Sequence, residues 1–442
     1  MKIAIIGSGI AGLGAAYALS QKYDITLYER DSRFGGHANT EVINVEGEEI
    51  AVDTGFIVYN EVNYPNLTAL FAHLGTPTKP SDMSFGFSMK GGQFEYACDN
   101  LNKIFAQRLN ILKPSFWGAF RDVMRFIKIA PQQLANDEIG DISLGDWLKR
   151  EGFGELFRDG FILPMGGAIW STPTDKMTAF PARNLLTFFD NHDLYTGLAA
   201  AIQWRTVDGG SHAYVDQIIE HLGPNAQTNR AVTSVIRLGG KVEINFADGE
   251  RDVVDQVIFA CHAPDACAML NAQDPEEAEV LGAFHTTQNT AILHRDPSLM
   301  PKRKKVWSSW SMITDDIHNS KGLADEPVSL TYWMNRLQTL PTNHDIFVTL
   351  NAQRRPDPAL TIAEYSYAHP GYDSVTFAAQ ARLDNVQGRG GVWYAGAWTG
   401  WGFHEDGLKS GLRVAAALGA RPDWAADLGA PLVTFESRIA AE

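Results

Sequence analysis

Three closely spaced glycines near the start of the chain could form a turn that binds a phosphate group. Gly7, Gly9 and Gly12 follow the apolar run Lys2–Ile6 and lie at the start of a predicted helix, Ile10–Ser20. At this spacing the first glycine permits a tight turn, and the second lets backbone N–H groups approach a pyrophosphate. The third lets the helix pack close to its strand. The free N–H groups and the dipole at the start of the helix then attract the phosphates.

An acidic residue and further glycines follow at spacings that extend this site. Glu29 ends the predicted strand Asp24–Tyr28, and its carboxylate can accept hydrogen bonds from two ribose hydroxyls. Gly35 and Gly36 come next, and a distant strand–glycine–helix segment spans Val392–Gly411. The glycine triplet alone fits an NAD site equally well. In combination with the other features it predicts FAD.

With these motifs the chain resembles the flavin-containing amine oxidoreductase superfamily, which includes monoamine oxidases, protoporphyrinogen oxidases and carotenoid desaturases. In that family an Arg usually follows the Gly-Gly pair, whereas this chain has His37 in the sequence GGHANT. The departure resembles a bacterial subgroup associated with modification of long-chain acyl lipids, often cyclopropane- or methyl-branched. The resemblance therefore implies a flavoenzyme and favours a lipid substrate.

The resemblance also implies a set of cofactor-binding positions. The family's Asp-x-Gly segment, close to the flavin, matches Asp53–Gly55, and Ala395-Gly396 matches the end of the distant strand. Val232 would flank adenine, or it is an ordinary core valine. The implied cofactor-binding residues are Gly7, Gly9, Ile10, Ala11, Gly12, Glu29, Arg30, Gly35, Gly36, His37, Ala38, Asn39, Thr40, Thr54, Gly55, Val232, Gly396, Phe403, Asp406, Gly407 and Leu408.

Titratable residues near the expected flavin are the candidates for proton transfer. In this family the flavin N5 accepts a hydride from a substrate carbon, so the protein positions the C–H bond and excludes water. His404 is the candidate catalytic residue, relaying a proton when a hydride and a proton leave adjacent carbons, with a structural role as the alternative. His37 is expected to bind a phosphate or ribityl oxygen, and Asp406 to be an N-cap or a catalyst. Outside these motifs, structural or exposed positions are expected for His192, His212 and His369.

The elements that must position these residues follow an α/β order. A predicted hairpin turns at Gly239-Gly240, a strand is expected at Val253–Ala260, and Ser211 is the predicted N-cap of a helix over His212–Leu222. The predicted fold is α/β, with a Rossmann-like FAD-binding domain of the glutathione-reductase type interleaved with an α+β substrate domain. We expect the FAD domain to comprise residues 1–85, 205–270 and 386–442, and the substrate domain residues 86–204 and 271–385.

Composition agrees with a globular two-domain enzyme. The 442 residues exceed one ordinary core, and the net charge of −15 argues against a nucleic-acid partner. Cys98, Cys261 and Cys267 show no metal or redox spacing, so we expect no metal site and a reducing, cytoplasmic location. FAD should be non-covalent, because no Cys lies near the C-terminal motif. No apolar run approaches the roughly 20 residues that span a bilayer, and glycines interrupt the start of the chain where a signal peptide would need an apolar core.

One stretch of the predicted substrate domain combines basic and aromatic residues. Between residues 102 and 130, aromatic and aliphatic side chains recur at helical spacing, and Asp122 is the single acid among six basic residues up to Ile129. A second basic segment beside a tryptophan spans residues 301–307. One interpretation is a peripheral membrane contact on the inner face of the membrane. The other is a helix with a core face and a solvated basic face.

The favoured function is dehydrogenation, a desaturation, of an apolar substrate such as a long-chain or branched fatty acyl lipid. Aromatic residues would suit an apolar channel: Trp170, Trp310, Trp333, Trp398, Trp401 and Phe403. Reduced flavin would be reoxidised by oxygen or a quinone. The alternatives are an amine oxidase, a redox-neutral double-bond isomerase, and a flavin- or lipid-binding protein without catalysis.

Overall fold

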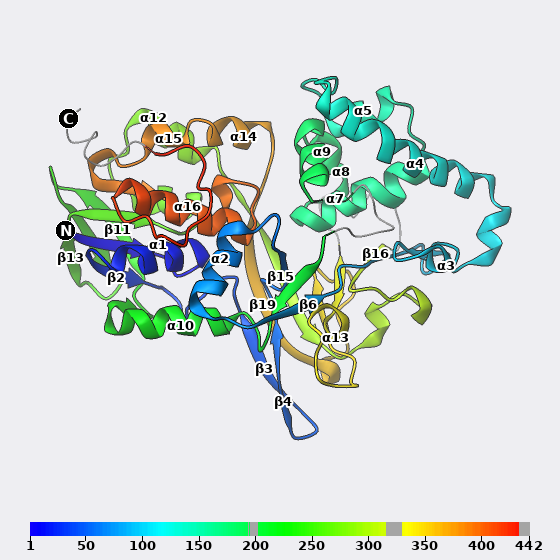
Figure 1. Cartoon of the computed structure of the whole chain (residues 1–442), viewed down its shortest axis with the longest axis horizontal. Helices are drawn as coiled ribbons and strands as arrows, with labels where there is room; N and C mark the ends of the chain where they lie inside the picture. The colour runs from blue at the N-terminus through cyan, green and yellow to red at the C-terminus, as the bar shows by residue number, and fades with distance from the viewer. Residues whose placement is uncertain (193, 195–201, 315–328, 433–442) are drawn as a thin grey trace.

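The computed structural model of the chain describes residues 1–192, 194, 202–314 and 329–432. Figure 1 shows two lobes, one containing α1 (Ile10–Ser20) and α16 (His404–Ala417), the other containing the long helix α4 (Pro114–Ala135). The α/β fold class with a Rossmann-like domain is confirmed by the parallel sheet of the first lobe. The expected domain boundaries stay a prediction.

A five-stranded parallel sheet forms the centre of the first lobe, in the order β10-β2-β1-β14-β20. Its two faces are buried in different ways. Ile3 and Ile5 of β1 pack among the helices, whereas Ala4 and Ile6 pack against an antiparallel sheet. Burial on both faces explains why the first strand reads as an unbroken apolar run. The strands are β1 (Lys2–Ile6), β2 (Asp24–Tyr28), β10 (Ala226–Gln227), β14 (Gln256–Phe259) and β20 (Val392–Tyr394).

Small residues bring the first and the last long helix of this lobe into contact. A Cβ on Gly411 of α16 would lie 2.2 Å from the carbonyl oxygen of Ala11, and one on Gly14 would lie 2.4 Å from Leu408 Cδ1. The absence of side chains at these glycines therefore lets α16 lie directly on α1. The helices α2 (Pro65–Leu74) and α10 (His212–Leu222) complete this layer (Figure 1).

The opposite face of the parallel sheet is covered by three antiparallel strands, β11 (Val232–Arg237), β12 (Val242–Phe246) and β13 (Arg251–Val254). The predicted hairpin between the first two is present. Gly239 and Gly240 have φ of +67° and +94°, as a primed two-residue turn requires. The single strand expected over Val253–Ala260 is wrong. The chain changes sheets at Asp255, whose N–H donates to the Lys2 carbonyl, so β13 and β14 are separate strands.

The second lobe is built on a seven-stranded sheet in the order β19-β15-β18-β17-β16-β7-β8. All of its neighbours are antiparallel except β16 and β7, which are parallel. Helices pack on this sheet around one apolar core. The strands are β7 (Phe85–Met89), β8 (Phe94–Ala97), β15 (Thr286–His294), β16 (Trp310–Thr314), β17 (Leu330–Trp333), β18 (Phe347–Leu350) and β19 (Thr361–Pro370).

The remaining elements connect the sheets or cover them. The helices are α3 (Leu101–Ile104), α5 (Leu144–Arg150), α6 (Glu155–Phe157), α7 (Leu163–Trp170), α8 (Thr174–Ala179), α9 (Ala182–Asn191), α11 (Ala263–Met269), α12 (Pro275–Gly282), α13 (Met334–Leu337), α14 (Ser374–Gln380) and α15 (Leu383–Val386). The short strands are β3 (Thr40–Val45), β4 (Glu48–Asp53), β5 (Tyr59–Asn60), β6 (Thr78–Ser81) and β9 (Trp204–Val207). Among the described helices, none has the length and apolar character that a membrane crossing requires.

Candidate functional site

A cavity of about 640 Å³ runs between the two lobes, and its lining residues include the N-terminal glycine motif and the segment that leads into α16. One end lies over the turn between β1 and α1, and the other is enclosed by α7, β16, β19 and the segment that leads into α16. A volume of this size is typical of sites that enclose a cofactor or a drug-sized ligand. The cavity is therefore the candidate site, and its two ends differ in chemistry.

The glycine turn at the first end has the geometry of an anion cradle. Gly7 has a φ of +104°, and a Cβ there would meet the Ala260 carbonyl oxygen at 2.9 Å, so only glycine fits. At Gly9, by contrast, no atom lies within 4 Å of the position that a Cβ would occupy. No side chain caps the start of α1. Its first N–H groups are thus available to a phosphate that fills the open space.

Glu29 lies beside this turn and is oriented by protein donors. Its carboxylate accepts hydrogen bonds from the N–H of Ser8 (2.9 Å), the Ser8 hydroxyl (2.5 Å) and the N–H of Asp31 (3.0 Å). A carboxylate offers about four lone-pair positions, so capacity remains for a ribose hydroxyl. The other carboxylates among the described lining residues, Asp31 and Asp265, also lie at this end.

The loop after Gly36 is held against the Asp53–Gly55 segment. The His37 carbonyl accepts a hydrogen bond from Phe56 N at 2.7 Å, and a Cβ on Gly55 would lie 2.2 Å from the same oxygen. Asn39 Nδ2 donates to the Thr54 hydroxyl and to the Tyr367 hydroxyl, both at 2.9 Å. Strand β19 of the second lobe is therefore tied to the loop that carries His37.

Asp53 is buried and joins three elements. It accepts hydrogen bonds from the Thr40 hydroxyl at 2.6 Å, from the N–H and hydroxyl of Ser211, each at 2.8 Å, and from Gln338 Nε2 at 3.0 Å. Burial raises the pKa of Asp53 to about 6 in spite of these donors. Ser211 occupies the predicted N-cap position of α10, but the expected capping bond is absent, because its side chain binds Asp53.

Some of the predicted cofactor residues line the cavity, and the others lie behind the residues that do. Those on the cavity wall are Gly7, Gly9, Ile10, Ala11, Glu29, Arg30, Gly36, His37, Thr54, Gly55, Val232, Gly396 and Phe403, joined by the candidate catalytic residue His404. Those that do not line it are Gly12, Gly35, Ala38, Asn39, Thr40, Asp406, Gly407 and Leu408. Gly12, for example, lies behind the turn, where a Cβ would be 1.9 Å from the Gly7 carbonyl oxygen.

Asp406 is one of the residues that do not line the cavity. It is the third residue of α16, and its carboxylate accepts a hydrogen bond from the N–H of Phe403 at 2.9 Å. The N-cap position expected for it is wrong, because Phe403 occupies that position. Burial raises the pKa of Asp406 to about 7. Its bond to Phe403 closes the first turn of α16 just below the cavity wall.

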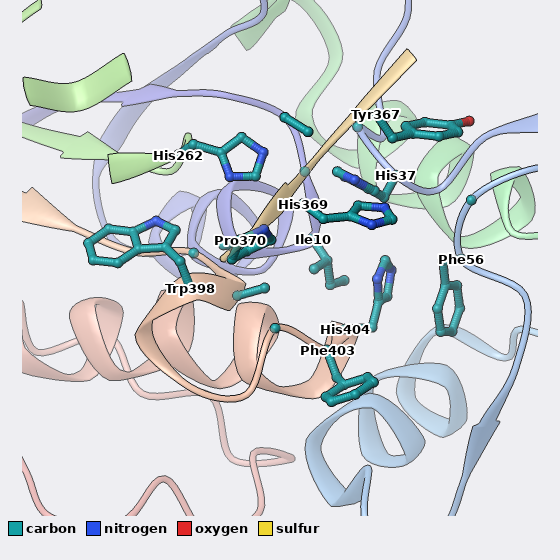
Figure 2. Close-up of a pocket in the computed structure, with 18 of the residues that line it drawn as sticks. Ile10, His37, Phe56, His262, Tyr367, His369, Pro370, Trp398, Phe403 and His404 are labelled. Carbon is teal, nitrogen blue, oxygen red and sulfur yellow. The ribbon is translucent and has the colours of Figure 1, made fainter. Parts of the chain in front are cut away.

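Histidines gather in the middle of the cavity (Figure 2). The His37 ring lies 5.4 Å from the His369 ring and 6.2 Å from the His262 ring, and it stacks on Tyr367 at 5.0 Å. Burial, followed by the neighbouring histidines, holds the pKa of His37 well below its usual range. Among the described residues, no group of three or more His, Cys, Asp or Glu could hold a metal ion. Burial also lowers the pKa values of His262 and His369, so the three imidazoles form a neutral part of the wall.

Two further histidines lie on the cavity wall although they belong to no cofactor motif. His192 and His369, expected to be structural or exposed, both line the cavity, and burial lowers the pKa of each to about 4. His369 Nδ1 lies 3.0 Å from the Ser171 hydroxyl. Neither histidine is close in sequence to a cofactor motif, so no local signal could have identified it. The third, His212, does not line the cavity.

His404 is held by two neighbours at the start of α16. Its ring stacks on Phe56 with centroids 3.7 Å apart and planes 7° from parallel, and its Nε2 lies 2.7 Å from the Tyr214 hydroxyl. Burial lowers the pKa of His404 to about 3 and raises that of Tyr214 well above its usual value. Both groups are neutral near physiological pH, so the imidazole does not start as an acid.

The far end of the cavity is apolar. Five of the six aromatic residues expected along a channel line the cavity, four of them at this end, whereas Trp333 packs with Trp307 and Phe347 outside it. Aliphatic side chains fill the spaces between the rings, and no described carboxylate lines this end. The described lining residues are those of an apolar ligand site: Phe56, Ile57, Val58, Met83, Phe85, Ile169, Trp170, Phe188, Trp310, Tyr332, Val348, Leu350, Tyr372, Trp401 and Phe403.

The acid stability of the apo-protein should depend on the buried histidines, and His369→Gln tests this. The unfolded chain binds a proton near pH 6.5, whereas folded His369 does so only near pH 4. Neutral His369 therefore contributes its full share to the free energy of unfolding above about pH 6.5. This contribution is lost as pH falls towards 4, by up to ~1.4 kcal/mol per pH unit. Urea titrations at neutral pH and at about pH 5 should show a smaller loss for His369→Gln than for wild type. Equal losses would contradict this account, and exposed His221→Gln is the control.

Comparisons with known proteins agree with this geometry. A family model described as flavin containing amine oxidoreductase matches residues 10–336. Protoporphyrinogen oxidase of Schizosaccharomyces pombe (strain 972 / ATCC 24843) is 27% identical over 184 residues, which cover 39% of this chain and 36% of that protein. The match thus spans little more than a third of that enzyme's length.

Solved structures show the same fold over nearly the whole chain. A fatty acid isomerase from P. acnes, described as producing CLA, superposes with a TM-score of 0.68 at 19% identity and covers 92% of this chain and 96% of its own. Cyclohexylamine oxidase from Brevibacterium oxydans superposes with a TM-score of 0.68 at 16% identity, covering 94% of this chain and 98% of its own. At these identities the likeness concerns the fold.

Proposed function

The chain belongs to the flavin-containing amine oxidoreductase family, and from that premise we propose that it is an FAD-dependent enzyme that dehydrogenates a long-chain acyl substrate. The observation that carries the proposal is the apolar end of the cavity, where no described residue supplies a carboxylate. An ammonium group placed there would lose its hydration without gaining a counter-charge, which costs several kcal/mol. A hydrocarbon chain gains free energy from the same surroundings.

The described residues fit FAD. The open space at Gly9, the uncapped start of α1 and the oriented Glu29 suit a pyrophosphate and a ribose. Among the described lining residues, four buried polar atoms have no partner within the protein: Arg230 Nε, His262 Nδ1, Trp310 Nε1 and Tyr372 OH. Such atoms are expected to bind a ligand or water. FAD, when bound, supplies a hydride acceptor at its flavin N5.

Non-covalent binding is supported, although for a different reason from the one that the sequence suggested. No Cys lies near the C-terminal motif along the sequence, but the fold brings Cys261 close to it. Trp398 Nε1 donates a hydrogen bond to the Cys261 carbonyl at 3.0 Å. Cys261 also lines the cavity. Burial raises the pKa of its thiol to about 12, which leaves almost no thiolate to attack a flavin.

The protein's own residues then position the substrate and handle the proton. Aromatic walls exclude water and align the chain so that one C–H bond faces the flavin end of the cavity. Dehydrogenation of a C–C bond also releases a proton from the adjacent carbon. Neutral His404, fixed by Phe56 and Tyr214, can accept that proton at its imidazole. Electrons would pass from the enzyme to oxygen or a quinone.

Replacing His404 tests this proton-transfer role. His404→Asn should retain bound flavin and melting temperature near wild type, while flavin reduction by substrate slows roughly 100- to 10,000-fold, as is typical for loss of a general base. Stopped-flow absorbance measures that rate as a function of pH. His192→Asn is the control, because His192 also lines the cavity but bonds the Phe188 carbonyl; its reduction rate should change less than about tenfold. Unchanged reduction by His404→Asn would remove His404 from the mechanism.

Anaerobic mixing with candidate substrates distinguishes the possible activities. Bleaching of the flavin absorbance by a long-chain acyl lipid, with formation of a double bond, is the expected result. Reduction by an amine, followed in air by hydrogen peroxide and aldehyde, would instead indicate an amine oxidase. If no lipid or amine reduces the flavin or yields a product, the protein binds its ligand without catalysis.

A redox-neutral isomerase is the second candidate, because the same apolar cavity would hold an unsaturated chain. The structural similarity to a fatty acid isomerase is consistent with this candidate. An isomerase would move a double bond along the chain with no net reduction of the flavin. Product analysis by mass spectrometry under anaerobic conditions separates the two, since desaturation changes the substrate mass and isomerisation does not.

A further inference from the structure

A second, smaller cavity of about 100 Å³ lies in the helical part of the second lobe. Its wall includes Phe116, Phe120 and Met124 of α4, Tyr96 of β8 and Gly160, and it contains no charged residue among those described. The polar groups in the wall are already satisfied or neutral. The Tyr96 hydroxyl donates to the Gly160 carbonyl at 2.7 Å, and burial raises the pKa of the Cys98 thiol to about 12. The cavity is therefore suited to a hydrocarbon.

This small cavity is adjacent to the candidate active site. Leu194 lines both cavities. A continuous series of rings also joins them: Phe85 on the main cavity stacks on Phe87, and Phe87 stacks on Tyr96 at 4.9 Å. Apolar side chains therefore separate the two cavities at these described positions.

The small cavity adjoins the solvent at an exposed apolar surface. Met124 both lines it and is 48% exposed. Figure 1 places α3 and the start of α4 at one end of the lobe, and these segments and the residues between them carry further large apolar side chains that are exposed. We call this group the apolar tip: Leu101, Leu109, Ile111, Leu112, Trp117 and Met124. Leu109 and Leu112 are 75% and 78% exposed, and large exposed apolar side chains gathered in one stretch of chain mark a candidate interaction surface.

Basic side chains from two distant segments surround the apolar tip. Arg108 and Lys305 both donate to Asn102 Oδ1, at 2.7 and 2.9 Å, so residues 301–307 lie beside α3. Residues 100–121 contain no Asp or Glu, although the chain carries a net charge of −15. The exposed cations of residues 102–130 and 301–307 are Arg108, Lys113, Arg121, Lys128, Lys302, Arg303, Lys304 and Lys305. Three of them are paired with an acid: Arg121 with Asp122, Arg303 with Glu95 and Lys304 with Asp345. This local charge complements an anionic surface.

We propose that the apolar tip docks on an anionic lipid bilayer and that the small cavity receives the acyl chain of a bilayer lipid on its way to the main cavity. The second half rests on the proposed function, because it takes an acyl chain as the substrate. Exposed Leu and Trp side chains bury in the headgroup region, and each nearby cation contributes about 1 kcal/mol of attraction. Both contributions come from one end of the molecule, so the small cavity faces the lipid.

Co-sedimentation with vesicles tests the docking surface. The probes are phosphatidylcholine vesicles, with and without phosphatidylglycerol. Wild type should bind the anionic vesicles at low salt, and added salt should weaken the binding. The double variant Leu109→Glu/Leu112→Glu should reduce the bound fraction about tenfold or more, because two carboxylates replace two of the most exposed apolar side chains. The matched control Val62→Glu/Val375→Glu changes residues that are 69% and 60% exposed and lie outside the tip, and it should bind as wild type does.

Three outcomes would overturn the docking proposal. The first is wild type that fails to sediment with anionic vesicles at low salt. The second is equal binding by the Leu109/Leu112 variant and wild type. The third is a wild type that is dimeric by light scattering and a Leu109→Glu/Leu112→Glu variant that is monomeric, because the apolar tip would then bind a second copy of the chain. Flavin content and melting temperature of each variant establish that it is folded.

Filling the small cavity tests its part separately. Ala119 lines it, and Ala119→Trp should leave vesicle binding unchanged but weaken the binding of parinaric acid, a fluorescent fatty acid, about tenfold. Ala135→Trp, at an exposed position of the same helix, is the control. Parinaric acid binding that is equal in both variants would exclude the small cavity as an acyl site. Vesicle binding that depends on the apolar tip, without flavin reduction by any lipid, would refute the proposed function but not the docking surface. Flavin reduction by detergent-dispersed lipid, without vesicle binding, would refute the docking surface but not the proposed function.

Discussion

Gly9→Leu is expected to produce a folded protein that no longer binds FAD. Gly9 has φ −65° and ψ 175°, a conformation open to any residue, and its Cβ position has no atom within 4 Å. The new side chain would therefore occupy the turn without straining the backbone. It would occupy the space where we propose that the pyrophosphate lies. Loss of even two charge-assisted hydrogen bonds, ~1.5–3 kcal/mol each, weakens binding more than roughly 100-fold.

Flavin absorbance of the purified protein and titration of FAD into the apo-protein measure this effect. Gly282→Leu is the matched control, because Gly282 also has no atom within 4 Å of its Cβ position and does not line the cavity. Apo-protein melting temperatures should be close for wild type and both variants. A yellow Gly9→Leu protein with wild-type affinity would mean that the cofactor does not use this turn, and every role assigned to the cradle would need revision.

Asp53→Ala should destabilise the protein by about 3–5 kcal/mol, because several buried donors would lose their acceptor at a cost of roughly 1–3 kcal/mol each. The donors of Thr40, Ser211 and Gln338 would lose their common acceptor and remain buried. Gln338 belongs to the segment after α13 of the second lobe, so the network ties that lobe to the β3–β4 hairpin and α10. Equilibrium unfolding in urea measures the change.

Asp53→Asn separates the lost charge from the lost hydrogen bonds. The amide keeps an oxygen acceptor for Thr40 and Ser211, so we expect a loss of only about 1 kcal/mol near neutral pH. Because burial raises the pKa of Asp53 to about 6, the wild type should gain stability as pH falls from 6 towards 4, and the Asn variant should lack that gain. Equal destabilisation by Ala and Asn at all pH values would show that the network matters only through its charge.

Much of the fold could be predicted because its signals are local. The strand Lys2–Ile6, the helix Ile10–Ser20 and the turn at Gly239-Gly240 agree with the structure, since burial on both faces, Ala-rich composition and paired glycines act within a few residues. The predictions that failed depended on distant partners. Ser211 binds Asp53 in place of its own helix, and the chain leaves one sheet for another at Asp255 because Lys2 pairs with it there.

The sequence by itself determined the phosphate cradle and the family, because a tight turn and a close helix–strand contact require glycine whatever the rest of the chain does. Tertiary structure alone decided what surrounds that cradle. His369 lies beside His37 only because β19 crosses the cavity, and burial there holds both imidazoles neutral. Likewise Arg108 and Lys305 meet at Asn102 only when the second lobe has folded. The burial of a side chain and the charges near it depend on segments that are distant in sequence. Its pKa and its exposure therefore cannot be predicted from the spacing of residues along the chain.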